Sequence, residues 1–137
     1  MTPHYPLELV AEALPAQVGT FRRALRRWLA DALGPDDEAA DLGDDLILAA
    51  SEALENVVDH AYEGVTPGSM TLTARVDGTE VTVVVTDAGH WREPDTGPTT
   101  RGRGIALMES LAEARVDRGE PGTVVTLRRG TAATAQG

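Results

Sequence analysis

The stretch SEALENVVDHAYEG, residues 51–64, closes a long segment in which apolar residues recur at helical spacing. This periodicity predicts a helix from Glu38 to Tyr62, with Gly64 just past its end. The predicted buried side consists of Leu42, Leu46, Ala49, Ala53, Val57 and Ala61. Glu52 and Asn56 are four residues apart, so both project from the same face of this helix. The sequence therefore predicts a central helix that carries two polar side chains one turn apart.

Glu52 and Asn56 are suited to a small charged ligand. A carboxylate can align or deprotonate a hydroxyl, and an amide oxygen can coordinate Mg²⁺, which completes its shell with water and phosphates. Glu and Asn at this spacing are also common on the solvated side of helices. For this pair alone, an ordinary polar stripe is the favoured interpretation. The case for a ligand site depends on motifs elsewhere in the chain.

Two elements are predicted before the central helix. Leu7, Leu9 and Ala11 alternate with polar or small residues, which indicates a first strand. A helix then starts at Pro15 and ends at Gly34-Pro35. Its apolar positions, spaced by three and four, are Val18, Phe21, Leu25, Trp28, Leu29 and Ala32. This pattern predicts an amphipathic helix with one face on a core.

After Pro67-Gly68 the apolar period changes to two, which predicts strands. The turn Asp77-Gly78 joins a strand that includes Met70, Leu72, Ala74 and Val76 to a strand at Val81–Thr86. A long loop is then expected from Asp87 to Arg103, followed by a short helix through Ile105 to Ala112 and strands at 114–118 and 123–129. The order predicts a two-layer α/β sandwich, with helices on one face of a mixed, largely antiparallel sheet.

Length and composition indicate one soluble domain. The 137 residues include 12 Lys plus Arg and 22 Asp plus Glu, a formal charge of −10, and no cysteine. This charge disfavours direct nucleic-acid binding, and a chain of this size needs neither disulfides nor structural zinc. No apolar run is long enough to span a membrane, and MTPHYPLELV lacks the features of a signal peptide, so a cytoplasmic protein is expected. We expect a domain at residues 1–129 and a disordered tail at 130–137.

Two further motifs lie at positions where a nucleotide could bind. Asp87 follows an apolar strand and precedes Gly89, so its carboxylate could accept a hydrogen bond from the exocyclic amine of adenine; alone, it is more often a turn residue. Gly102 and Gly104 open a helix, where free backbone amides can hold phosphate. A long polar loop precedes this Gly-x-Gly, unlike a Rossmann motif, and no P-loop sequence occurs.

In chain order, these motifs and Gly122-Thr123 resemble the nucleotide site of the GHKL ATPases. The resemblance is strongest to the small anti-sigma-factor serine kinases of bacteria, the sporulation and stress-response regulators. It is carried by SEALENVVDHAYEG, VVVTDAGHW, RGRGIALMESLA and GTVVTLRR, and it spans nearly the whole chain except the tail. It implies a Bergerat-type sandwich that is a histidine-kinase-like ATP-binding domain, with ATP and Mg²⁺ as cofactors.

The resemblance also implies roles for individual residues. Glu52 would be the catalytic carboxylate, Asn56 the metal ligand and Asp87 the adenine contact. Gly89 would shape the base pocket and Thr123 would support it. Gly102 and Gly104 would belong to the ATP lid, and Arg101 and Arg103 are both candidates for the arginine near the γ-phosphate. The sequence departs from the family at His90-Trp91, where a second glycine is common, so the entry to the loop is bulkier.

The leading hypothesis is therefore an ATP-dependent serine-protein kinase and anti-sigma factor. It would phosphorylate an anti-anti-sigma protein and so regulate a sigma factor. The alternative is a non-catalytic module of the same fold that sequesters a regulator, for which Trp91 is the best support. The ATPase half of a sensor histidine kinase is less favoured, since no phosphoacceptor helices precede the domain. A homodimer is left open.

Other charged residues have simpler interpretations. His60 lies near the end of the central helix, where a cation suits the helix dipole, and His4, His60 and His90 show no metal-binding spacing. A basic cluster on the first helix is most simply a solvated face, with docking of an acidic partner as the less favoured interpretation. Its members are Arg22, Arg23, Arg26 and Arg27.

Overall fold

The computed structural model describes residues 5–62, 65–89, 99–119 and 122–130, which form three α-helices, a π-helical turn and five strands. In chain order the elements are β1 (Leu7–Glu12), α1 (Pro15–Leu33), α2 (Asp37–Asn56), η1 (Val57–Ala61), β2 (Ser69–Asp77), β3 (Glu80–Asp87), α3 (Thr99–Leu111), β4 (Glu113–Arg118) and β5 (Thr123–Gly130). The predicted order of strands and helices is confirmed.

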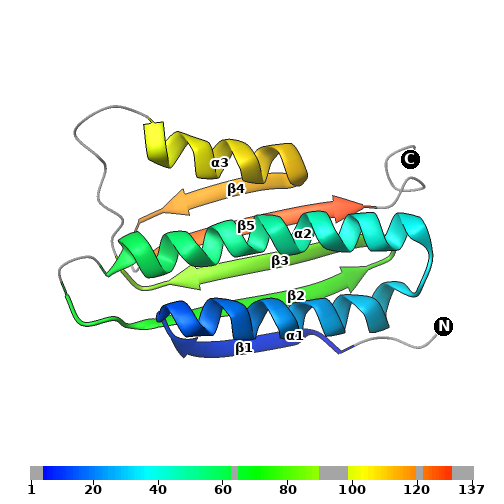
Figure 1. Cartoon of the computed structure of the whole chain (residues 1–137), viewed down its shortest axis with the longest axis horizontal. Coiled ribbons are helices and arrows are strands. Elements are labelled where there is room, and N and C mark those ends of the chain that lie inside the picture. Colours follow the sequence, from blue (N-terminus) through cyan, green and yellow to red (C-terminus); the bar gives the residue numbers. More distant parts are fainter. Residues whose placement is uncertain (1–4, 63–64, 90–98, 120–121, 131–137) are drawn as a thin grey trace.

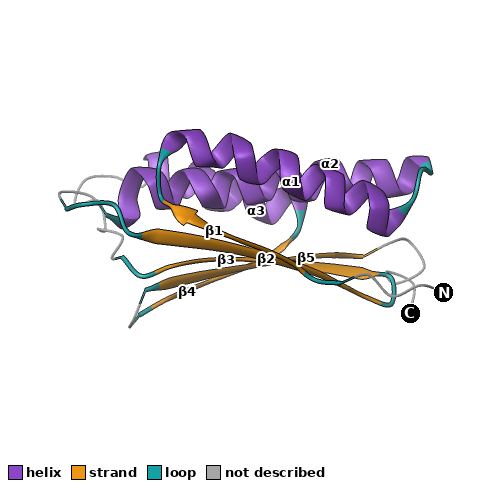
Figure 2. Ribbon diagram, turned by 90° about the horizontal axis from the view of Figure 1, so that it is seen from below, coloured by secondary structure: helices purple, strands orange, loops and turns teal. Residues whose placement is uncertain are grey.

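The five strands form one sheet in the order β1-β2-β3-β5-β4, and all three helices lie on one face of it (Figures 1 and 2). The predicted two-layer α/β sandwich is confirmed. Each neighbouring pair among the described strands is antiparallel. The sheet is thus antiparallel throughout its described part, although the sequence had left room for a mixed one.

The core lies between the helices and the sheet. Alternate residues of the strands point into it. In β2, Met70, Leu72 and Ala74 face the helices and are almost completely buried, as the period of two predicts. The central strand β3 adds Val81, Val83 and Val85. Among the largest fully buried side chains on the helix side are Leu25, Leu46 and Leu54. The opposite face of the sheet carries mostly threonine, valine and charged residues and has no helix against it (Figure 2).

Part of the basic cluster on α1 pairs with α2. Arg22 donates from Nε to the hydroxyl of Ser51 at 3.0 Å, and Arg26 lies 3.3 Å from a carboxylate oxygen of Asp44. Ser51 is buried and donates in turn to the carbonyl of Ile47. Two of the four arginines therefore have intramolecular partners on the neighbouring helix. This pairing favours a structural role for half of the cluster over the docking role.

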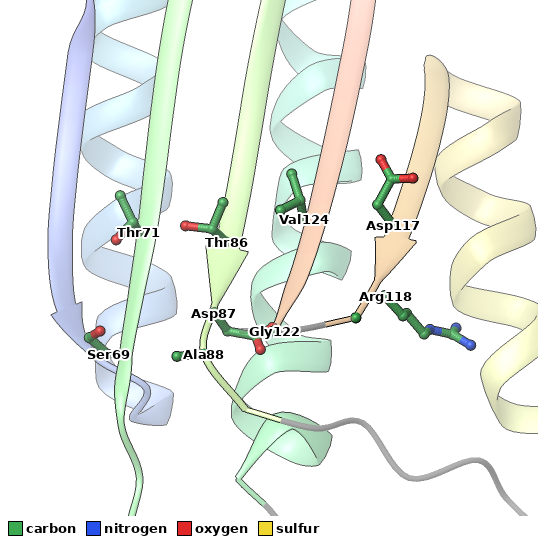
Figure 3. Close-up of a pocket in the computed structure, with 10 residues that line it drawn as sticks. Ser69, Thr71, Thr86, Asp87, Ala88, Asp117, Arg118, Gly122 and Val124 are labelled. Carbon is green, nitrogen blue, oxygen red and sulfur yellow. The ribbon is translucent and has the colours of Figure 1, made fainter.

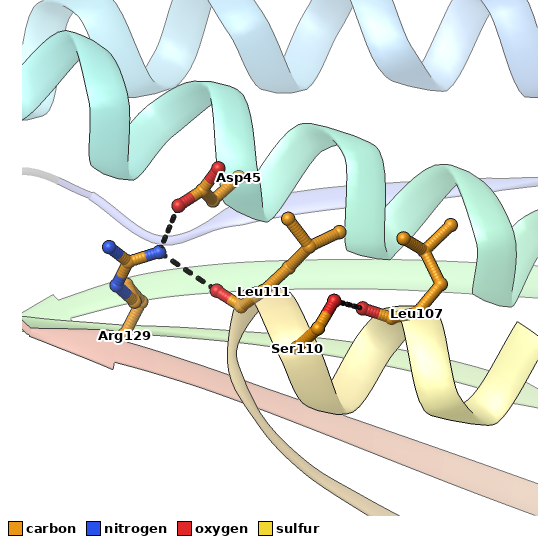
Figure 4. Close-up of polar contacts among 5 residues, drawn as sticks. All are labelled: Asp45, Leu107, Ser110, Leu111 and Arg129. Atoms are coloured by element: carbon orange, nitrogen blue, oxygen red, sulfur yellow. Dashed lines mark hydrogen bonds and ion pairs between the residues drawn. The ribbon is translucent and has the colours of Figure 1, made fainter.

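Arg129 joins three elements at the end of the molecule opposite the predicted site (Figure 4). Its Nη1 donates to a carboxylate oxygen of Asp45 on α2 and, at 2.8 Å, to the carbonyl of Leu111 at the end of α3. A helix leaves its last carbonyls without intrahelical partners, so a cationic donor is favourable there. Arg129 therefore fixes the carboxyl end of α3 to both α2 and β5.

The structure corrects three boundaries. The central helix ends as an α-helix at Asn56 and continues as the π-helical turn η1, which periodicity alone cannot distinguish. The loop expected to reach Arg103 ends earlier, because α3 begins at Thr99. A helical glycine costs only about 1 kcal/mol relative to alanine, which packing of α3 on α2 can offset. Gly130 belongs to β5 rather than to the tail.

Some predictions fall outside the described residues. These are the tail at 131–137, His4, and His90-Trp91 at the entry to the loop. Within the described part of the chain, no helix is both long enough and apolar enough to cross a membrane.

Candidate functional site

Glu52 and Asn56 lie on the last turns of α2 and are both half-buried. Burial raises the pKa of the Glu52 carboxyl above its ordinary value of 4.5, and the nearby charges of Glu55 and Asp59 raise it further. Ser51, immediately before Glu52, is fixed to α1 through Arg22. The pair therefore sits on a helical turn that is tied to α1.

The turn after Asn56 is π-helical. The backbone N–H of Val57 lies in hydrogen-bonding range of two carbonyls, those of Ala53 and Leu54, where the α-helix gives way to η1. Val57 and Ala61 remain buried in the core. Single π-helical turns inside longer helices are frequent at functional sites. Here the turn begins directly after Asn56.

The end of β3 meets the end of this helix. Asp87 is 8% exposed, and its Oδ1 accepts a hydrogen bond from the backbone N–H of Gly89 at 2.9 Å. A Cβ on Gly89 would lie 2.1 Å from the carbonyl oxygen of Ala61. Only glycine fits at this distance, so the close contact between η1 and the turn after β3 requires Gly89. A carboxylate can accept about four hydrogen bonds, so the Gly89 bond does not exhaust Asp87.

The start of β5 completes the same region. Thr123 is opposite Asp87 in the register of β3 and β5 and is 2% exposed. A Cβ on Gly122 would lie 1.9 Å from the carbonyl oxygen of Asp87. The sequence Gly122-Thr123 thus allows the two strands to meet closely at the strand end that carries Asp87.

Four parts of the predicted site converge at one end of the molecule (Figure 1). The ends of α2–η1 and β3 lie there, together with the beginnings of β5 and α3. The first turns of α3 include Arg101, Gly102, Arg103 and Gly104. The side chains of residues 99–104 lie outside the description, so the structure does not decide between the two arginines.

Comparison with known proteins shows the family to which the domain belongs. A model of the histidine kinase-like ATPase domain matches residues 11–129, which is most of the chain. The chain belongs to this family. As an ATPase domain it is similar to part of a crystal structure of the RsbU and RsbW domains of Rv1364c from Mycobacterium tuberculosis, with 30% identity and a TM-score of 0.76. That match covers 95% of this chain and 33% of the other chain, so this ATPase domain spans about a third of that length.

A hollow of about 500 Å³ lies on the face of the sheet away from the helices. Thr71, Thr86, Val124 and Asp117 stand in a row across four strands on that face (Figure 3). Glu52 and Asn56 do not line it, since they lie in the helical layer. Asp87, Ala88 and Gly122 line one end of it, so the hollow reaches the strand ends of the predicted site but not the helix that carries Glu52 and Asn56.

The residues present fit a magnesium nucleotide. Among the described residues, no group of three or more His, Cys, Asp or Glu side chains could hold a metal alone. Mg²⁺ bound with ATP differs from such a site, because phosphates and water supply most of its ligands and the protein adds only one or two oxygens. The amide oxygen of Asn56, half-buried at the end of α2, is of the right chemical type. Asn56 would hold the ion, which would neutralise charge on the phosphates.

Tyr62, to which the sequence assigned no role, lies beside Asp87 and Gly89. Its hydroxyl bonds to two backbone segments beside Asp87, and its ring packs against Gly68. The available signal was the position of a tyrosine directly after the buried end of the central helix, with glycines at 64 and 68. Its contacts join segments distant in sequence, which no local pattern predicts.

Proposed function

We propose that this histidine kinase-like ATPase domain is an ATP-dependent serine-protein kinase and anti-sigma factor. Its substrate would be an anti-anti-sigma protein, and the exchange would regulate the availability of a sigma factor in the cytoplasm. One observation carries the proposal: the end of the helix that bears Glu52 and Asn56 contacts the strand end that bears Asp87 and Gly89. A base contact, a metal ligand and a carboxylate would then serve one nucleotide.

In this reaction Glu52 would orient the serine hydroxyl and accept its proton. The serine oxygen would form a bond to the γ-phosphorus while the bond from that phosphorus to the bridging oxygen of ADP would break, with ADP as the leaving group. Phosphoryl transfer depends mainly on positioning and charge stabilisation, so no covalent enzyme intermediate is needed. Asn56 would hold the metal, Asp87 the adenine, and Arg101 or Arg103 the developing charge. Gly102 and Gly104 would let the lid approach the phosphates.

The environment of Glu52 supports a role as a base. A proton acceptor works best when its pKa approaches the operating pH, and burial together with Glu55 and Asp59 raises the pKa of Glu52 in that direction. Half-burial also leaves the carboxylate accessible from solvent. Glu52 can therefore meet a serine presented by another protein.

The similarity to an RsbW domain supports a protein substrate. A groove of about 470 Å³ between α1 and the end of α2 also leaves room near Glu52. It is lined by Val18, Gly19, Arg22, Glu55, Val58 and Asp59, with Pro15 and Ala16. The mixture of one cation and two carboxylates suits a polar protein segment.

The experiment compares Glu52→Ala with Asp41→Ala, an exposed carboxylate nearer the start of the same helix and outside the groove. Transfer of radiolabelled phosphate from ATP to candidate anti-anti-sigma proteins is measured for both and for the wild type. Glu52→Ala should lower transfer by about a hundredfold or more while ATP binding is retained, since positioned bases contribute factors of this size. Asp41→Ala should transfer at nearly the wild-type rate.

A pull-down of the same partner separates kinase from sequestering module. If the wild-type protein captures its partner, binds ATP and transfers no phosphate, the kinase proposal fails and the non-catalytic module is favoured. Equal transfer by Glu52→Ala and the wild type would remove Glu52 from the catalytic role.

A further inference from the structure

We infer that Tyr62 is a positioning residue of the nucleotide site: it holds the turn from Asp87 to Gly89 against η1 and so sets the preference for adenine over guanine. The inference rests on the proposed function, because it assumes that Asp87 contacts the base. Tyr62 itself would not touch the nucleotide. It would act through the backbone on either side of Ala88.

The hydroxyl of Tyr62 bonds to two segments at once. It accepts a hydrogen bond from the backbone N–H of Ala88 at 2.9 Å and donates one to the carbonyl of Ser69 at 2.8 Å. Ala88 directly follows Asp87, and Ser69 begins β2, the strand that pairs with β3. A single hydroxyl therefore ties the end of β3 to the start of β2.

The ring of Tyr62 fills the space between two glycines. A Cβ on Gly68 would lie 2.7 Å from the ring, and a Cβ on Gly89 would lie 3.0 Å from it. Because side chains are absent at both positions, the ring lies close to both backbones. Phenylalanine would keep this packing and lose only the hydroxyl, which makes it a clean substitution.

Two hydrogen bonds and one backbone contact contribute to the position of the Asp87 carboxylate. The Ala88 N–H is held by Tyr62, the Gly89 N–H bonds to Oδ1 of Asp87, and Gly89 rests on the carbonyl of Ala61. Tyr62 immediately follows η1, so this turn is coupled to the helix of Glu52 and Asn56.

The preference for adenine over guanine depends on the position of the Asp87 carboxylate. A carboxylate attracts the exocyclic amine of adenine and repels the carbonyl oxygen of guanine, and both effects depend on short distances and correct angles. Displacement of Asp87 by a fraction of an ångström would weaken the attraction more than it changes contacts with the phosphates. Loss of the Tyr62 hydroxyl should therefore affect ATP more than GTP.

The test compares Tyr62→Phe with Tyr5→Phe by calorimetric titration with ATP, GTP and tripolyphosphate in Mg²⁺. Tyr5 is 89% exposed, so its substitution is the matched control. Tyr62→Phe should weaken ATP about five- to tenfold, the equivalent of one lost hydrogen bond, and reduce the ATP-to-GTP affinity ratio by a similar factor. Tripolyphosphate affinity should be unchanged, and Tyr5→Phe should match the wild type.

A purely structural role would lower the melting temperature and weaken ATP and GTP equally, and an unchanged ratio would overturn the inference. If wild-type protein bound no ATP, the proposed function would fail first, and this inference with it. Amide hydrogen exchange at Ala88 adds a measurement that needs no nucleotide. Exchange should be faster in Tyr62→Phe than in the wild type, and identical rates would also overturn the inference.

Discussion

The backbone of Gly89 touches the backbone of Ala61: a Cβ built on Gly89 would lie only 2.1 Å from the Ala61 carbonyl oxygen. The carbonyl oxygen belongs to the backbone and cannot move aside as the end of a flexible side chain could. An alanine at position 89 would therefore force β3 and η1 apart. This contact holds together the two elements on which the proposed site depends.

We expect Gly89→Ala to destabilise the fold by about 1–3 kcal/mol, the usual cost of overpacking, or more because backbone must move. ATP affinity should fall as well, since Asp87 and Asn56 would separate. Gly119→Ala is the control, because a Cβ there has no atom within 4 Å. Urea unfolding of both variants checks this. Equal unfolding midpoints would show that the contact of Gly89 with Ala61 leaves room for a methyl group.

Asp87→Asn should weaken ATP binding by at least roughly 1.5–3 kcal/mol, the range of a hydrogen bond to a charged group. Asparagine keeps an oxygen that can accept from the Gly89 N–H, so the turn itself should survive. Calorimetry with ATP measures the loss, and Asp117→Asn, at an exposed position of β4, is the control. Unchanged affinity with an intact fold would remove Asp87 from the site.

Asn56→Ala should reduce ATP affinity in Mg²⁺ far more than in EDTA, by about tenfold or more in the ratio, if its amide oxygen is a metal ligand. The measurement is titration with a fluorescent ATP analogue under both conditions. An equal loss in Mg²⁺ and in EDTA would mean that Asn56 supports the junction of α2 and η1 instead.

The raised pKa of Glu52 gives stability a defined pH dependence. The folded protein binds this proton more tightly than the unfolded chain, so the contribution is fully present below pH 4.5 and is lost as pH rises through the folded pKa. Glu52→Gln should therefore be slightly more stable than the wild type at pH 7, and this difference in stability should become smaller near pH 4. The gain should be small, because solvent screens this half-exposed carboxylate. Urea midpoints at both pH values, with the exposed Glu109→Gln as control, measure it.

Arg129→Met should lower the free energy of unfolding by about 1.5–3 kcal/mol, the range for hydrogen bonds to charged groups, because Asp45 and the Leu111 carbonyl both lose their donor. Arg128→Met, at an exposed position of the same strand, should have little effect. Thermal unfolding compares the two. Similar melting temperatures would show that water replaces the Arg129 contacts at no cost.

Local patterns were sufficient to predict most of the fold. The period of two in Met70, Leu72 and Ala74 corresponds to the buried face of β2, and Pro15 and Gly34 mark the limits of α1. The pattern could not reveal η1, because Val57 and Ala61 are buried in either type of helix. It also assigned the Gly102 region to a loop, since the contact of α3 with α2 is a tertiary effect.

Site residues were predictable where local chain geometry requires a particular residue type. They were not predictable where the requirement comes from tertiary contacts. Asp87 and Gly89 stand out beside a strand, and the structure adds the reason for the glycine, a contact with Ala61. Tyr62 gives no local signal, because its partners Ser69 and Ala88 lie on other segments. The nucleotide roles of these residues stay predictions.

The π-helical turn has a consequence for insertions and deletions. An i→i+5 turn contains one residue more than an α-helical turn, so the helix before Val57 and the chain after Ala61 are out of phase with each other. Deleting one residue within Val57–Ala61 could restore a continuous α-helix, with every backbone hydrogen bond intact. It would also rotate Tyr62 by about a quarter of a turn relative to Asn56, away from Ser69 and Ala88. The segment should tolerate changes in the identity of its residues far better than a change in their number.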